Sequence, residues 1–345
     1  MTAKPSAKPA PRGFDKELAE LDALSEALKS GASIVENSTK CLRKALTHRN
    51  NFLVAKAARM VGDQALFALL PDVLAAYDRF FINGVQSDPQ CWAKNALVKT
   101  LVKLDHREKD AYLRGLRCHQ LEPTWGGSTD TAGALRGACT HALVNCPGIQ
   151  DAELLTILLE PLVDSDKTVR VEAARAIGQV NGASAALLLR LRALIGPLPT
   201  DVDAPEVLGA VYSALLSVEA ERAIPLVSAA MKEGGDLAGE AAFALADLRT
   251  HEALAALQKR LRAGADAWFT SVLFSAIALT RLPEAMDFLL DLVARDAREA
   301  PTAIEAISRL APNAELRARV EEAVAKTGSE RLAQTLRQHL PAQSS

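Results

Sequence analysis

The sequence predicts an all-α protein with the architecture of an α-solenoid, a superhelical array of about eight helical hairpins. Two observations predict this fold class. Hydrophobic residues form 49% of the 345-residue chain but aromatic residues only 4%, and a composition dominated by alanine and leucine favours helices over sheets. In addition, one helical pattern recurs along the chain at intervals of 30 to 42 residues.

The recurring pattern is a helix in which small residues precede an aliphatic anchor. The anchors are Val61, Leu101, Leu143, Ile177, Leu215, Leu245, Ile277 and Ile307. Between successive anchors lies a second apolar-periodic segment, for example residues 65–77, so each unit contains two helices. A two-helix unit of this length cannot bury both apolar stripes alone. Neighbouring units are therefore expected to stack and to share one continuous core.

The array is predicted to form a single domain over residues 15–340. Residues 15–44 are expected to be N-terminal capping helices, residues 45–310 the repeats and residues 311–340 C-terminal capping helices. Residues 1–14, which are rich in Pro, Ala and Lys, are predicted to be a disordered tail, and residues 341–345 a second tail. Because no stretch has the pattern of a secretory signal or of a membrane span, the expected location is the cytoplasm.

The stretch DSDKTVRVEAARAIG, residues 164–178, carries the most informative spacing. Asp164 precedes Arg170 by six residues, and Val169, Ala173 and Ile177 share one helix face. The same acid-to-base spacing recurs in Asp130–Arg136 and in Asp88–Lys94. With these residues the chain resembles the HEAT-repeat family, in its short bacterial form related to the phycobilisome-lyase-like repeats.

The resemblance covers most of residues 45–310 and implies a role for the acid–base pairs. In the family, an acid in the turn between two helices meets a basic residue early in the second helix. A ladder of such charge-assisted hydrogen bonds aligns successive repeats. The resemblance thus implies a structural role for Asp130, Arg136, Asp164 and Arg170, and it implies no particular activity.

The segment from Gly115 to Gly137 breaks the repeat pattern. It contains Trp125, followed directly by two glycines, and several polar residues stand nearby. One interpretation is a loop between helices that contacts a partner, with Trp125 as the apolar anchor. The other is that Trp125 covers the hydrophobic core where a long loop folds back, the glycines permitting the turn. The candidate partner-binding residues here are His119, Glu122, Trp125, Gly126 and Gly127.

A second candidate surface is the helix position opposite the apolar face, occupied by Arg175 in its unit. Along the chain this column is Arg59, Lys99, His141, Arg175, Ser213, Phe243, Ser275 and Glu305. It begins basic and ends acidic, as does the chain, whose residues 39–140 carry a net +6 and residues 141–345 a net −7. Second helices commonly line the concave side of HEAT-like arrays, so Arg59, Lys99, His141 and Arg175 are candidates for contact with an acidic partner. A solvated helix face without a partner is the alternative.

The sequence contains no motif for a cofactor, a metal or catalysis. There is no CxxC, HExxH, GxSxG or phosphate-binding glycine loop, and Cys139 and His141 diverge because they lie two residues apart on a helix. The five cysteines predict reduced thiols, since their number is odd and they are not closely paired. The di-iron deoxyhypusine hydroxylases, which resemble this architecture, use several His–Glu pairs, whereas this chain has only His251–Glu252.

These patterns together predict a non-catalytic scaffold or adaptor that binds another protein through its concave surface and the Trp125 segment. Two alternatives stay open. One is a nucleic-acid-binding array that uses the basic front half, which the modest charge excess disfavours. The other is a lyase-like, ligand-processing protein, which only the likeness of the repeats supports. No membrane and no metal partner is expected.

Overall fold

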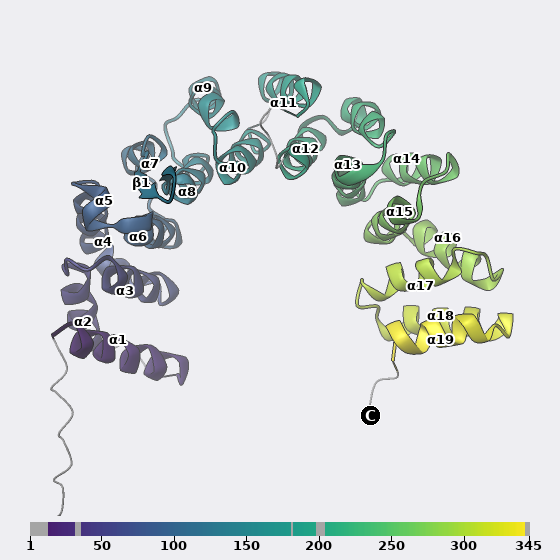
Figure 1. Cartoon of the computed structure of the whole chain (residues 1–345), viewed down its shortest axis with the longest axis horizontal. Helices are drawn as coiled ribbons and strands as arrows, with labels where there is room; N and C mark the ends of the chain where they lie inside the picture. Colours follow the sequence, from purple (N-terminus) through teal and green to yellow (C-terminus); the bar gives the residue numbers. More distant parts are fainter. Residues whose placement is uncertain (1–12, 32–35, 181, 198–203, 342–345) are drawn as a thin grey trace, which may run out of the picture. The chain divides into compact units, whose positions relative to one another are not determined.

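The computed structural model describes residues 13–31, 36–180, 182–197 and 204–341. These residues form nineteen α-helices, two short 3-10 helices and one β-hairpin (Figure 1). The prediction of an all-α protein is confirmed apart from that hairpin. Most of the two predicted tails, residues 1–14 and 341–345, lies outside the described residues. At the inner end of the first tail the prediction is wrong, because helix α1 already begins at Gly13.

The chain divides into two compact units, residues 1–173 and residues 174–345. The elements of the first unit are α1 (Gly13–Lys29), α2 (Glu36–Leu46), α3 (Asn51–Asp63), η1 (Phe67–Leu69), α4 (Leu70–Arg79), α5 (Gly84–Ser87), η2 (Pro89–Cys91), α6 (Trp92–Lys103), α7 (Lys109–Leu116), β1 (Leu121–Thr124), β2 (Gly127–Asp130), α8 (Gly133–Leu143) and α9 (Asp151–Leu162). Helix α10 (Lys167–Ile177) crosses the boundary. The elements of the second unit are α11 (Ala183–Ile195), α12 (Ala204–Ala230), α13 (Gly235–Asp247), α14 (His251–Arg262), α15 (Ala267–Leu279), α16 (Pro283–Ala294), α17 (Ala300–Ser308), α18 (Ala314–Thr327) and α19 (Glu330–His339).

Every segment predicted to carry an anchor is a helix. These helices are α3, α6, α8, α10, the first part of α12, α13, α15 and α17. All eight anchor side chains are fully buried. Helix α12 bends at Glu219, where φ and ψ are −146° and 60°, so its two parts correspond to two predicted helices. The helical pattern in the sequence therefore located both the helices and their buried faces.

Anchor helices that follow one another in the chain also pack against one another within each unit. In the first unit α3 contacts α6 and α6 contacts α8; in the second, α12 contacts α13, α13 contacts α15 and α15 contacts α17. Small residues permit close approach: a Cβ atom added at Gly178 would lie 2.8 Å from the Cβ atom of Ala214. Between α3 and α6, the hydroxyl of Thr100 donates to the carbonyl of Ala58 at 2.7 Å.

The β-hairpin corrects one expectation. The segment around Trp125 was expected to be a loop, but residues Leu121–Thr124 and Gly127–Asp130 form two antiparallel strands. Leu121 pairs with Asp130, and Thr124 pairs with Gly127. The strands were not predicted because both are only four residues long, β1 contains Pro123, and β2 reads Gly-Ser-Thr-Asp without an apolar residue at alternate positions.

None of the helices in the described part of the chain is both long enough and apolar enough to cross a membrane.

Candidate functional site

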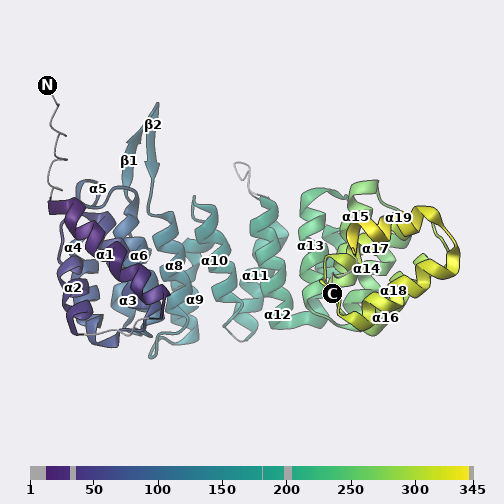
Figure 2. The same cartoon turned by 90° about the horizontal axis from the view of Figure 1, so that it is seen from below.

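The β-hairpin displays Trp125 at its tip. Figure 2 shows β1 and β2 extending beyond the ends of the neighbouring helices α6 and α8. The turn consists of Trp125 and Gly126, and Gly126 has a φ of +87°, a conformation that glycine adopts without strain. The indole of Trp125 is fully exposed, at 105% of its reference area. The interpretation that Trp125 covers the hydrophobic core is therefore wrong.

The base of the hairpin is joined to the helices by the buried guanidinium of Arg136, which is only 1% exposed. Its Nη1 donates to Asp130 at 2.7 Å and to the carbonyl of Cys118 at 3.0 Å. Its Nε and Nη2 donate to the two carboxylate oxygens of Asp164 at 2.8 and 2.9 Å. Arg136 thus bridges Asp130, six residues before it, and Asp164, the acid at the equivalent position of the next helical hairpin.

Asp130 ends strand β2 and accepts hydrogen bonds from several directions. The backbone amides of Gln120 and Ala132 each donate to it at 3.0 Å, and Nδ1 of His119 lies 2.8 Å away. Burial alone would raise the pKa of Asp130, but these hydrogen bonds and that from Arg136 hold the pKa well below its ordinary value. Asp130 is therefore a charged structural group, and His119 is an exposed neighbour that orients toward it.

A second buried network holds the other strand. The ammonium of Lys94, fully buried in α6, lies 3.1 Å from Asp88 and donates to the side chain of Gln120 at 2.9 Å. Gln120 in turn donates to the carbonyl of Asp88 at 2.8 Å and to Glu122 at 2.7 Å. Asp88 and Lys94 are the third pair with the six-residue spacing. Two such pairs therefore contact the base of the hairpin, one through Gln120 and the other through Asp130.

Glu122, a predicted partner-binding residue, also takes part in the base. Its carboxylate accepts from the amide of Gln90 at 2.6 Å and from the hydroxyl of Thr131 at 2.7 Å. Gln90 and Cys91 both have positive φ, 58° and 53°, which non-glycine residues adopt only when neighbours hold them there. Burial opposes ionisation of Glu122, yet the hydrogen bonds lower its pKa overall. Within this geometry Glu122 stabilises the turn that precedes α6.

The fourth member of the predicted ladder makes a different contact. Arg170 donates from Nη1 to the backbone carbonyls of Asp164 and Ser165, at 2.7 and 2.9 Å. The six-residue spacing thus brings acid and base residues together at Asp164 and Arg170 as well, where Arg170 contacts the backbone carbonyl of Asp164.

The basic residues of the predicted column differ in exposure and in their ionic contacts. Arg59 on α3 and Lys99 on α6 are exposed, and neither forms an ion pair with any of the described residues. His141 on α8 is half-exposed, and its Nδ1 lies 3.3 Å from the carboxylate of Glu172. Arg175 is exposed but belongs to the second unit. In the first unit, Arg59 and Lys99 are therefore the members of the column whose charge is not balanced locally.

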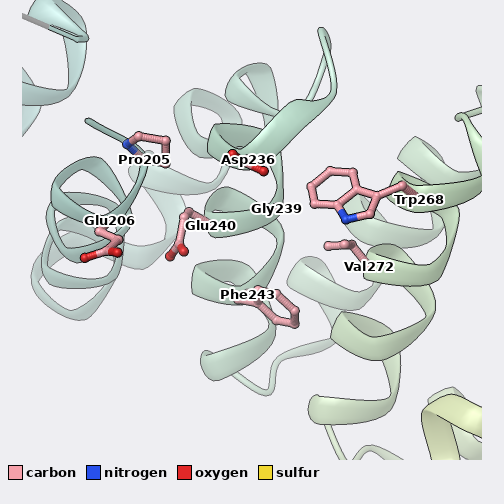
Figure 3. Close-up of a pocket in the computed structure, with 8 residues that line it drawn as sticks. All are labelled: Pro205, Glu206, Asp236, Gly239, Glu240, Phe243, Trp268 and Val272. Carbon is pink, nitrogen blue, oxygen red and sulfur yellow. The ribbon is translucent and has the colours of Figure 1, made fainter. Parts of the chain in front are cut away.

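Sequence reasoning missed a pocket in the second unit, lined by residues of α12, α13 and α15. Its volume is about 300 Å³, and Figure 3 shows Glu206 and Glu240 on one side and the indole of Trp268 on the other. Asp236, Glu240 and Phe243 are spaced by four and three residues on α13. This spacing, which is visible in the sequence, places the three side chains on one face of the helix. The sequence alone does not place Trp268 in this pocket, because only the packing of α15 on α13 brings its side chain to the same site.

A second missed feature is an exposed apolar stripe on α11. Leu187, Leu191, Leu194 and Ile195 are between 55% and 68% exposed. Their spacing of three to four residues was visible in the sequence, but the same spacing also describes a buried stripe.

Cys91, Cys139 and Cys146 are buried, whereas Cys41 and Cys118 are half-buried. Cys139 packs among helices, and burial raises the pKa of its thiol to about 12. A thiol with that pKa is protonated at neutral pH and is a poor nucleophile. Among the described residues, no three His, Cys, Asp or Glu side chains lie close enough to hold a metal ion.

Comparison with models of known protein families gives no match to this chain, and comparison with curated protein sequences gives none either.

Proposed function

We propose that the chain is an α-solenoid of HEAT-like hairpins that acts as a non-catalytic scaffold and binds a protein partner through the Trp125 hairpin. Support for the solenoid comes from the eight buried anchors, from the serial packing of their helices within each unit, and from the acid–base pairs at Asp130–Arg136 and Asp88–Lys94. Repeats that contact only their neighbours form elongated arrays with large binding surfaces.

One observation carries the binding proposal: a fully exposed tryptophan stands on a hairpin whose base is fixed by buried hydrogen bonds. An isolated two-stranded hairpin of this length is marginally stable in water. The networks of Arg136 and Lys94 therefore keep Trp125 in position before any partner arrives. A pre-positioned aromatic side chain loses little conformational freedom on binding, and tryptophan is enriched among residues that dominate binding energies.

The substitution Trp125→Ala tests the proposal. Affinity capture of the tagged full-length protein from its own cell extract, quantified by mass spectrometry, is expected to lose its specific partner at least about tenfold. The melting temperature should stay unchanged because the indole is fully exposed. Leu121→Ala is the matched control, since it removes an exposed apolar side chain from the same hairpin away from its tip.

Two outcomes would contradict the proposal. One is capture of the same proteins in equal amounts by wild type and Trp125→Ala. The other is recovery of nucleic acid whose binding weakens steeply with salt and is abolished by Arg59→Glu or Lys99→Glu, because that response is the mark of phosphate contacts.

A further inference from the structure

The pocket between α12, α13 and α15 combines carboxylates with aromatic surface. Asp236 and Glu240 stand one turn apart on α13, and Glu206 faces them from the first turn of α12. Trp268 from the first turn of α15 is half-exposed, and its ring lies against Gly239, where an added Cβ atom would be 3.4 Å from Cη2. Figure 3 shows Glu206 and Glu240 on one side, the indole of Trp268 on the other and Asp236 between them.

The residues that line the pocket supply no positive charge to Asp236 or Glu240. Among the described residues that line it there is no lysine, arginine or histidine. Neither Asp236 nor Glu240 forms an ion pair with any part of the chain that the structure describes. Burial, together with repulsion from Glu206 and Asp236, raises the pKa of Glu240. A cation entering the pocket would relieve that repulsion, so the pocket is electrostatically complementary to a positive ligand.

The geometry favours an organic cation over a metal ion. Along the described residues, no three acidic, His or Cys side chains converge closely enough to coordinate one metal. The lining also includes Phe243, Val272 and Pro205, which offer apolar surface to a hydrocarbon chain. At about 300 Å³ the space is at the small end of the range for ligand pockets.

We propose that this pocket binds the side chain of an arginine in an extended segment of a partner protein. A planar guanidinium stacks on the indole of Trp268 while its N–H groups donate to Glu240 and Asp236, and the aliphatic stem lies on Phe243 and Val272. Lysine offers a point charge without the planar stacking surface, so it binds more weakly. The proposal does not depend on Trp125, which lies in the other compact unit.

The test uses three blocked tripeptides and NMR of the full-length protein. The probes are acetyl-Gly-Arg-Gly-amide, its lysine analogue and its citrulline analogue, the last being a neutral isostere of arginine. The chain has three tryptophans, so Trp→Phe variants assign the three indole N–H resonances. The arginine peptide is expected to shift the Trp268 resonance saturably. The lysine peptide should bind several-fold more weakly, and the citrulline peptide should give no saturable shift.

Substitutions locate the effect. Glu240→Gln preserves side-chain volume and is expected to weaken the arginine peptide about tenfold, because one charge-assisted hydrogen bond is lost. The control Asp247→Asn makes the same charge change at the other end of α13, outside the pocket, and should change affinity less than about twofold. Thermal unfolding of each variant shows whether the fold is retained. Trp125→Ala should leave affinity for the peptide unchanged. The peptide experiment can therefore contradict the arginine pocket without contradicting the Trp125 proposal, and the capture experiment can do the reverse.

Several results would overturn the proposal. Equal shifts from the citrulline and arginine peptides, or unchanged affinity in a folded Glu240→Gln variant, would show that charge does not drive binding. A response of Trp125 in place of Trp268 would move the site. Free arginine is expected to bind more weakly than the blocked peptide, because Asp236 should repel its α-carboxylate. Tighter binding of free arginine would therefore indicate that the ligand is a free amino acid and not a segment of a protein. Magnesium chloride alone shifting Trp268 as strongly would indicate a metal site.

Discussion

Replacing Arg136 with methionine is expected to lower the free energy of unfolding by about 3–5 kcal/mol. The guanidinium is 1% exposed and compensates both Asp130 and Asp164, so its removal leaves two poorly solvated carboxylates without their shared partner. Methionine keeps the hydrophobic stem and fills most of the volume. Chemical denaturation at neutral pH measures the change. The control Lys109→Met breaks an ion pair to Glu153 whose side chains are 39% and 49% exposed, and it should cost less than about 1 kcal/mol.

The effect of Arg136→Met should depend on pH in a defined direction. Because the pKa of Asp130 is depressed in the folded state, its stabilising contribution is present above the unfolded pKa of about 3.9 and is lost as the pH falls toward the folded value. The variant has already lost part of that depression. The difference in stability between wild type and variant should therefore shrink as the pH is lowered from about 5 to about 2. A difference that is constant or grows on acidification would show that the charge on Asp130 is not what Arg136 stabilises.

The substitution Gly115→Ala is expected to destabilise the protein by about 1–3 kcal/mol although alanine is the better helix former. An added Cβ atom would lie 2.3 Å from both Sγ of Cys139 and the hydroxyl of Tyr77. Both neighbours are fully buried, and they come from α8 and α4, so three helices meet at this position without room to separate.

Two further variants isolate the cause. In a background carrying Tyr77→Phe and Cys139→Ala, both colliding atoms are absent, and Gly115→Ala should there cost much less. At Gly239, where an added Cβ atom meets Trp268 only at an ordinary 3.4 Å, the change to alanine should stabilise the helix by up to about 1 kcal/mol. If Gly115→Ala stabilises the protein as Gly239→Ala is expected to, close helix approach at Gly115 does not limit stability.

The sequence located the helices well because their signal is local. Each anchor, such as Ile177, follows small residues at helical spacing, and that pattern alone determines a helix and its buried face. The six-residue spacing likewise predicted that Asp130 meets Arg136. The ladder of hydrogen bonds between successive repeats, which the resemblance to HEAT repeats implies, agrees with the contact of Arg136 with Asp164.

The hairpin and the pocket escaped prediction for the same reason. The strands beside Trp125 have no strand-forming pattern, and their stability comes from Gln120 and Glu122 hydrogen-bonding to groups some 30 residues earlier in the chain. In the pocket, Glu240 and Trp268 are brought together only by the packing of α13 on α15. Tertiary contacts between distant residues leave no local periodicity in a single sequence.

Small-angle X-ray scattering of the full-length protein tests most directly whether its hairpins stack into an extended array. A compact globular protein of this length would have a radius of gyration of about 20 Å. The proposed α-solenoid predicts a clearly larger radius and an asymmetric distance distribution with a long tail. A radius near about 20 Å with a symmetric distribution would contradict the stacked arrangement on which the proposed scaffold function depends.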